Sequence, residues 1–133
     1  MYITITYNEL SELVYNKFNV RPKFITIDEK TFEVGYKPSV FIPNVCIQFH
    51  IEMINKDNVC LSYECSVPTS LMIASIVAYI KETIPSGVEV NTINKYINIY
   101  PQRFKQIEKT LEFVTLSNIT FVEDKVNVEL KII

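Results

Sequence analysis

Residues 45–53, VCIQFHIEM, and residues 59–65, VCLSYEC, decide the fold of this chain. In both stretches apolar and polar side chains alternate strictly, which is typical of a β-strand with one buried face. The five residues between them, INKDN, suit a hairpin loop. A slip of one residue would turn one apolar set toward the wrong face, so the pattern predicts a single register. The predicted cross-strand pairs are Met53 with Val59, Ile51 with Leu61, and Phe49 with Tyr63.

The outward face of this hairpin carries His50, the single histidine of the chain. In the predicted register His50 lies opposite Ser62 and diagonal to Cys60 and Glu64. A cysteine within reach of a histidine can act as a nucleophile, so Cys60 and His50 give one hypothesis, a cysteine-dependent enzyme. No known local signature surrounds either residue, and the alternative is a solvent-facing histidine beside a semi-exposed cysteine. Zinc accepts these ligand types with Glu52 or Glu64, but the short paired spacing of structural sites is absent, so no metal is expected.

Alternation and turn residues predict further strands on both sides of this hairpin. An earlier hairpin is expected to turn at residues 28–31, with Ile27 opposite Phe32. Residues 88–90 and 95–100 read as strands, and a last hairpin turns at residues 122–125. The apolar faces are Ile25 and Ile27 with Phe32, Val34 and Tyr36 in the earlier hairpin, and Ile119 and Phe121 with Val126, Val128 and Leu130 in the last.

Helical spacing predicts a helix near each end of the chain. Thr6 and Glu9 fit a capping box, so the first helix is expected from about residue 7 to residue 18. Near the other end, Pro101 is suited to the first turn of a helix. The apolar stripe of that helix is expected to be Phe104, Ile107, Leu111 and Val114.

A helix between these two is expected to begin near Thr69 or Ser70 and to run to about Ile84, and it is highly apolar. A helix that is apolar nearly all round must be buried on more than one side. Three interpretations stay open: a central core helix, a homo-oligomer interface, or the wall of a cavity for an acyl chain. One stripe, Ile73, Ile76, Val77 and Ile80, is expected to pack on Ile47, Phe49, Ile51 and Leu61 of the sheet. The flanking face, Leu71, Ala74 and Ala78, is the candidate ligand or interface surface.

These elements predict the fold class α+β: an antiparallel sheet of hairpins packed against about three helices, one of them highly apolar. The chain has 133 residues, which fits a single domain, residues 1–133. The net charge of −2 argues against nucleic-acid binding, which needs clustered Lys and Arg. There is no signal-peptide pattern, and the longest apolar run, residues 71–80, is too short to span a membrane. The protein is therefore expected to be cytoplasmic, and its three cysteines, Cys46, Cys60 and Cys65, to be free thiols.

The stretch from Pro85 to Ile132 resembles bacterial domains of the tubular lipid-binding superfamily in its alternation of apolar and polar residues. The resemblance rests on alternation and on an Asn-Ile-x-Phe hairpin. It implies an antiparallel sheet curled around a long helix, with an apolar groove for lipid and no catalytic motif. The segments that carry it are SGVEV (86–90), INI (97–99), LEFVTLSNITF (111–121) and VNVEL (126–130).

The leading functional hypothesis is a non-enzymatic binding or assembly module, without a cofactor, whose ligand is an apolar or lipid-like molecule. The alternative is a structural protein that self-associates as a homo-oligomer, for instance a component of a phage or mobile element. The third hypothesis is the cysteine-dependent enzyme that uses Cys60 and His50.

Overall fold

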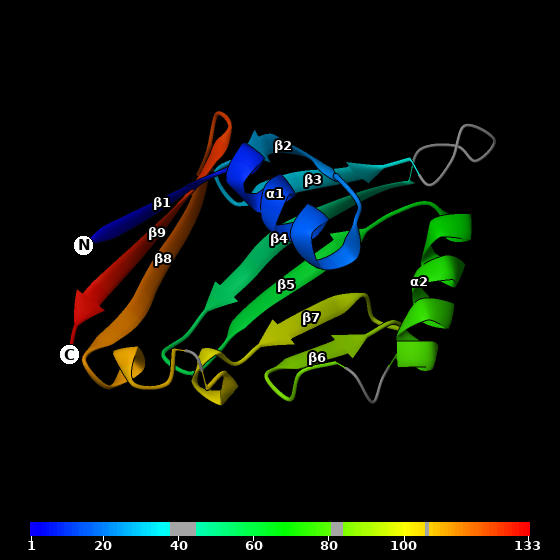
Figure 1. Ribbon diagram of the computed structural model, residues 1–133. Coiled ribbons are helices and arrows are strands. Elements are labelled where there is room, and N and C mark those ends of the chain that lie inside the picture. The colour runs from blue at the N-terminus through cyan, green and yellow to red at the C-terminus, as the bar shows by residue number, and fades with distance from the viewer. Residues whose placement is uncertain (38–44, 81–83, 106) are drawn as a thin grey trace.

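The computed structural model describes residues 1–37, 45–80, 84–105 and 107–133, which form nine strands, two α-helices and two short 3₁₀ turns (Figure 1). All strand pairs in this part of the chain are antiparallel. The larger sheet has the order β2-β3-β4-β5-β7-β6, and the smaller one has the order β1-β9-β8. The elements are β1 (Tyr2–Thr6), α1 (Tyr7–Phe18), β2 (Lys23–Asp28), β3 (Thr31–Tyr36), β4 (Val45–Ile54), β5 (Val59–Glu64), α2 (Val67–Ile80), β6 (Val88–Asn91), β7 (Tyr96–Ile99), η1 (Pro101–Arg103), η2 (Thr110–Glu112), β8 (Val114–Val122) and β9 (Lys125–Ile132).

The predicted α+β class with three helices is wrong, because the chain is mostly β with two α-helices in its described part. The third predicted helix is replaced by the 3₁₀ turns η1 and η2. Phe104, expected on the helical stripe, has an extended backbone and places its ring against Gly87, in the turn before β6. Arg103 beside it donates a hydrogen bond of 3.1 Å to the carbonyl of Ser86. These tertiary contacts override the weak preference of the segment for a helix.

The β4–β5 hairpin confirms the predicted pairs of Phe49 with Tyr63 and Ile51 with Leu61. The predicted pair of Met53 with Val59 is wrong. The register shifts between Ile51 and Met53, so that Glu52 is the extra residue of a β-bulge and Met53 lies opposite Cys60. Ile54 therefore pairs with Val59, and the turn is shortened to Asn55–Asn58, closed by a backbone hydrogen bond of 2.8 Å between those two residues.

The register expected for the β2–β3 hairpin is also wrong. Thr26, and not Ile27, lies opposite Phe32, and Phe24 lies opposite Val34. Ile25 and Ile27 consequently point outward and are 46% and 49% exposed. An aromatic cluster explains this choice, because the Phe24 ring packs between Tyr7 and Phe32 with centroid distances of 5.7 and 6.4 Å. Three rings in contact bury more apolar surface than two isoleucines would.

Helix α1 and the last hairpin agree with the sequence. The Thr6 hydroxyl accepts from the N–H of Glu9, and the Glu9 carboxylate accepts from the N–H of Thr6, which completes the predicted capping box. Strand β1 was not predicted, although Ile3 and Ile5 alternate with polar neighbours. In the structure β1 pairs with β9. In β8 and β9 the pairs are Ile119 with Val128, Phe121 with Val126 and Leu116 with Leu130.

The core lies where the two sheets meet. Ile51, Val59 and Phe121 form its buried centre, and the Phe121 ring packs on Phe32 with centroids 4.7 Å apart. The β8–β9 hairpin therefore covers the inner face at Ile51 and Leu61, where the apolar helix was expected. The side chain of Ile76, central to that expected stripe, lies outside the described residues. The hairpin is held in place by the Phe121 N–H, which donates to the Glu29 carbonyl of the β2–β3 turn at 2.9 Å.

Candidate functional site

Helix α2 begins at Val67, slightly earlier than the predicted Thr69 or Ser70. Ser66 explains the earlier start, because its hydroxyl accepts from the Thr69 N–H at 3.3 Å and its carbonyl accepts from the Ser70 N–H at 2.8 Å. These contacts satisfy donors that a helix start leaves free. The capped start places α2 directly after β5.

Helix α2 stands beyond the end of the larger sheet, not over its face (Figure 1). It has no charged residue between Val67 and Ile80, yet it makes no extensive contact with another described helix or strand. Val67 is 71% exposed and Leu71 is 67% exposed. A helix with this composition is normally buried. Its exposed apolar surface is therefore the most unusual feature of the described structure.

The three candidate residues of the sequence, Leu71, Ala74 and Ala78, share one face of α2 through their spacing of three and four. Leu71 and Ala78 are exposed, and Ala74 is half-buried. This face combines one large apolar side chain with two small ones. Two small side chains beside one leucine leave room for another helix to approach closely.

The whole chain exposes more surface than a compact monomer of its size. Its accessible surface is 9246 Å², about 2,000 Å² above the roughly 7,200 Å² that size scaling gives for 15.5 kDa. No side chain in the described part is completely buried. The few buried apolar residues there are Tyr7, Ile51, Val59, Tyr63, Val114 and Phe121.

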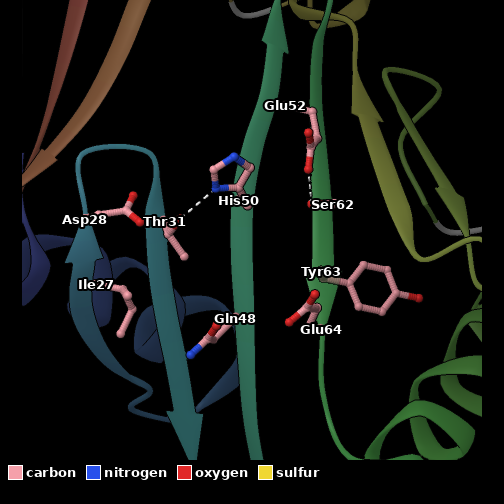
Figure 2. A pocket seen from close by; sticks show the side chains of 9 residues that line it. All are labelled: Ile27, Asp28, Thr31, Gln48, His50, Glu52, Ser62, Tyr63 and Glu64. Atoms are coloured by element: carbon pink, nitrogen blue, oxygen red, sulfur yellow. Dashed lines mark hydrogen bonds between the residues drawn. The ribbon is translucent and has the colours of Figure 1, made fainter.

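A cleft of about 370 Å³, lined mostly by polar side chains, lies on β2 to β5 (Figure 2). Tyr63 contributes to its lining, but its ring is buried and packs against Phe49. His50 Nδ1 and the Thr31 hydroxyl are 2.6 Å apart, and the Ser62 hydroxyl donates to the Glu52 carboxylate at 2.6 Å. As predicted, His50 lies opposite Ser62. The cleft is lined by Ile27, Asp28, Thr31, Gln48, His50, Glu52, Ser62, Tyr63 and Glu64.

Asp28 lies in the same cleft as His50 and is held by a hydrogen bond from a backbone N–H of its own hairpin turn. The Lys30 N–H donates to the Asp28 carboxylate at 2.9 Å and lowers its pKa, and the Thr31 hydroxyl and the nearby His50 lower it further. The direction of the hydrogen bond between the Thr31 hydroxyl and His50 Nδ1 depends on the tautomer of the imidazole.

Cys60, predicted diagonal to His50, lies opposite Met53 on β4 and Asn98 on β7, and the direct partner of His50 is Ser62. No hydrogen bond joins the Cys60 thiol to His50 among the described residues, where His50 bonds to Thr31. Cys60 is also absent from the lining of the cleft. All three cysteines are free thiols, as predicted.

Within the described ranges, no three His, Cys, Asp or Glu side chains are placed to hold a metal ion together. No helix in the same ranges is long and apolar enough to cross a membrane.

Comparison with protein-family models, curated proteins and solved structures gives no match to this chain. The resemblance of residues 85–132 to the tubular lipid-binding superfamily therefore stays a prediction.

Proposed function

We propose that this chain is a non-enzymatic assembly module that associates with a second copy of itself through α2. The observation that carries the proposal is an uncharged, apolar helix that stands outside the core with Leu71 67% exposed. Large exposed apolar patches mark interaction sites in soluble proteins, because water disfavours them. The chemistry of the site is the burial of apolar surface.

A second copy suits α2 because the helix is complementary to itself. Two such helices bring no like charges together and bury no unpaired charge, which would be costly. Ala74 and Ala78 allow close approach of a partner helix, since interaxial distances near 8 Å need small contact residues. Leu71 can then pack against the partner helix.

An apolar small molecule, the other ligand class expected from the sequence, is bound best in an enclosed apolar cavity. Helix α2 instead lies at the end of the larger sheet, with Val67 71% and Leu71 67% exposed (Figure 1). Such a surface favours a protein partner. Self-association is also the property that the hypothesis of a structural phage or mobile-element component requires.

The test compares two exposed leucines of the two helices. Leu71 of α2 and Leu13 of α1 are 67% and 60% exposed. Sedimentation equilibrium of wild type, Leu71→Asp and Leu13→Asp is measured over a wide concentration range, with circular dichroism as the control for folding. Leu71→Asp should weaken association at least ~10-fold, since a buried unpaired charge costs more than ~1.4 kcal/mol. Leu13→Asp should leave association unchanged.

Two results would contradict the proposal. One is a wild-type chain that stays monomeric at high concentration. The other is equal association of wild type and a folded Leu71→Asp variant.

A further inference from the structure

The two sheets have four edge strands, β2, β6, β1 and β8, and three of them carry protection against pairing with another chain. β2 begins with Lys23 and has an irregular register near its end, and β6 carries Glu89. β8 has an irregular register between Leu116 and Asn118, and its outer side is bonded to the β2–β3 turn through the Phe121 N–H. β1 has neither a charge nor a bulge within Tyr2–Thr6.

The hydrogen bonds of β1 show which backbone groups point outward. Met1 exchanges bonds of 2.8 and 3.2 Å with Leu130 of β9, and the Tyr7 N–H donates to the Asp124 carbonyl. Hydrogen-bonded and non-hydrogen-bonded pairs alternate along an antiparallel ladder. The backbone N–H and C=O groups of the odd-numbered residues of β1 therefore point toward β9. The N–H and C=O groups of Tyr2 and Thr4 therefore point away from β9. Thr6 offers no free N–H, because the Glu9 carboxylate accepts its hydrogen bond.

We infer that β1 pairs with β1 of a second copy, antiparallel and across a twofold axis at Ile3, so that the two small sheets become one continuous sheet. In this register Tyr2 of each copy lies opposite Thr4 of the other, and each such pair exchanges both backbone hydrogen bonds. Ile3 lies opposite Ile3 at the axis. A register centred on Thr4 would oppose Tyr2 to Thr6, whose N–H is already taken.

A second copy is the occupant that the strand itself favours. The sequence YITIT has no charge, so like charges do not meet across the axis. Tyr2 is 69% and Ile3 is 47% exposed, and both gain a neighbour when the strands pair.

This interface is independent of the one proposed for α2. In Figure 1, β1 and α2 lie at opposite ends of the molecule, so one copy can use both surfaces together. Each contact alone closes a dimer, whereas the two in alternation join copies into longer chains. Breaking one contact should leave dimers, and breaking both should leave monomers.

The first test uses Thr4, because its N–H points outward and its hydroxyl bonds only to Asn127 in the same chain. Thr4→Pro removes the outward N–H, at a strand position where proline is tolerated. The matched control Thr4→Val loses the same hydroxyl and keeps the N–H. Both are placed in the Leu71→Asp chain and studied by sedimentation equilibrium. Thr4→Val should remain a dimer, and Thr4→Pro should be a monomer.

The second test does not depend on how well the proline variant folds. Directly opposed residues of a non-hydrogen-bonded pair have Cα atoms about 4.5 Å apart, which suits a disulfide. Ile3→Cys, oxidised with glutathione disulfide, should therefore form a covalent dimer joined through residue 3, identified by peptide mass spectrometry. The parent chain, with its three native thiols, is the control.

The inference is overturned if the Leu71→Asp chain is already monomeric, if Thr4→Pro remains dimeric, or if Ile3→Cys gives no bridge between the two copies at residue 3. The first of these outcomes leaves the α2 proposal standing. Conversely, a Leu71→Asp chain with wild-type mass and a residue-3 bridge would retain the β1 interface and reject the α2 one.

Discussion

The β8–β9 hairpin covers the inner face of the larger sheet, whereas helix α2, which was predicted to cover that face, lies beyond the end of the sheet. Both are rich in apolar residues. The hairpin supplies Phe121 and Val126 to the core around Ile51, whereas α2 keeps Leu71 exposed. Apolar composition alone therefore does not decide which segment is buried.

The periodicity of each segment explains the difference. The hairpin alternates with period two, so one sheet face takes all of its large core residues and the other face can meet water. Helix α2 has no polar face, so contact with a single sheet would still leave apolar surface exposed. A segment with one apolar face can bury that face within a single chain. A segment that is apolar all round needs a partner to bury the remaining surface.

The largest expected effect tests the buried side of this comparison. Phe121→Ala should destabilise the fold by about 3–5 kcal/mol, because Phe121 is 5% exposed and its ring packs on Phe32. Leu71→Ala, at 67% exposure, should change stability by less than about 0.5 kcal/mol in dilute, monomeric samples. Urea unfolding of both variants measures the contrast, and similar losses for the two would place α2 in the core.

A smaller effect tests the exposed side. Ala78→Asp should leave the melting temperature of the dilute protein within a few degrees of wild type, because Ala78 is exposed. It should weaken self-association by about 10- to 100-fold, since the dimer would bury a charge. Ala78→Ser is the matched control and should associate nearly as wild type. Unfolding of Ala78→Asp at all concentrations would instead identify this face as core.

The two helix caps should differ in their influence on the whole fold. Thr6→Ala removes the capping box of α1 and should cost about 1 kcal/mol of global stability, because Tyr7 of this helix is buried. Ser66→Ala removes the cap of α2 and should increase hydrogen exchange within α2 while global stability changes little. A Ser66→Ala variant as destabilised in urea as Thr6→Ala would show that α2 is coupled to the core.

The smallest effect concerns acid. The pKa of Asp28 is lowered first by the Lys30 N–H, so ionised Asp28 stabilises the folded chain above its unfolded pKa, about 3.9. This contribution is lost as the pH falls through the lower folded pKa. Asp28→Asn should therefore flatten the decrease in melting temperature below about pH 4, which wild type retains. An equal decrease in melting temperature with falling pH in the variant and in wild type would argue against this role.

The parts that sequence reasoning predicted correctly depend on neighbouring residues. Thr6 and Glu9 define α1 locally, and the β4–β5 and β8–β9 hairpins follow from alternation around short turns. The spacing of Leu71, Ala74 and Ala78 likewise places them on one helix face. Their exposure could not be predicted, because it depends on which distant segment covers the sheet.

The errors come from contacts between distant parts of the chain. Phe24, and not Ile25, faces inward because Tyr7 and Phe32 complete an aromatic cluster with it. The polar cleft was missed for a related reason: His50 and Ser62 share the predicted outward face, but Thr31 reaches His50 only through the pairing of β3 with β4. No local sequence pattern predicts the pairing of β3 with β4.

The pairing of β1 with β9 also determines the order in which the molecule can be completed. The hydrogen bond between Thr4 and Asn127 joins residues 123 positions apart. Such contacts form slowly, because a long loop must close before they contribute. β1 precedes β9 by more than a hundred residues in the chain, whereas α1 and the hairpins can form from local contacts. The pairing of β1 with β9 is therefore expected to form late, and the β1 edge reaches its native geometry only after β9 is in place.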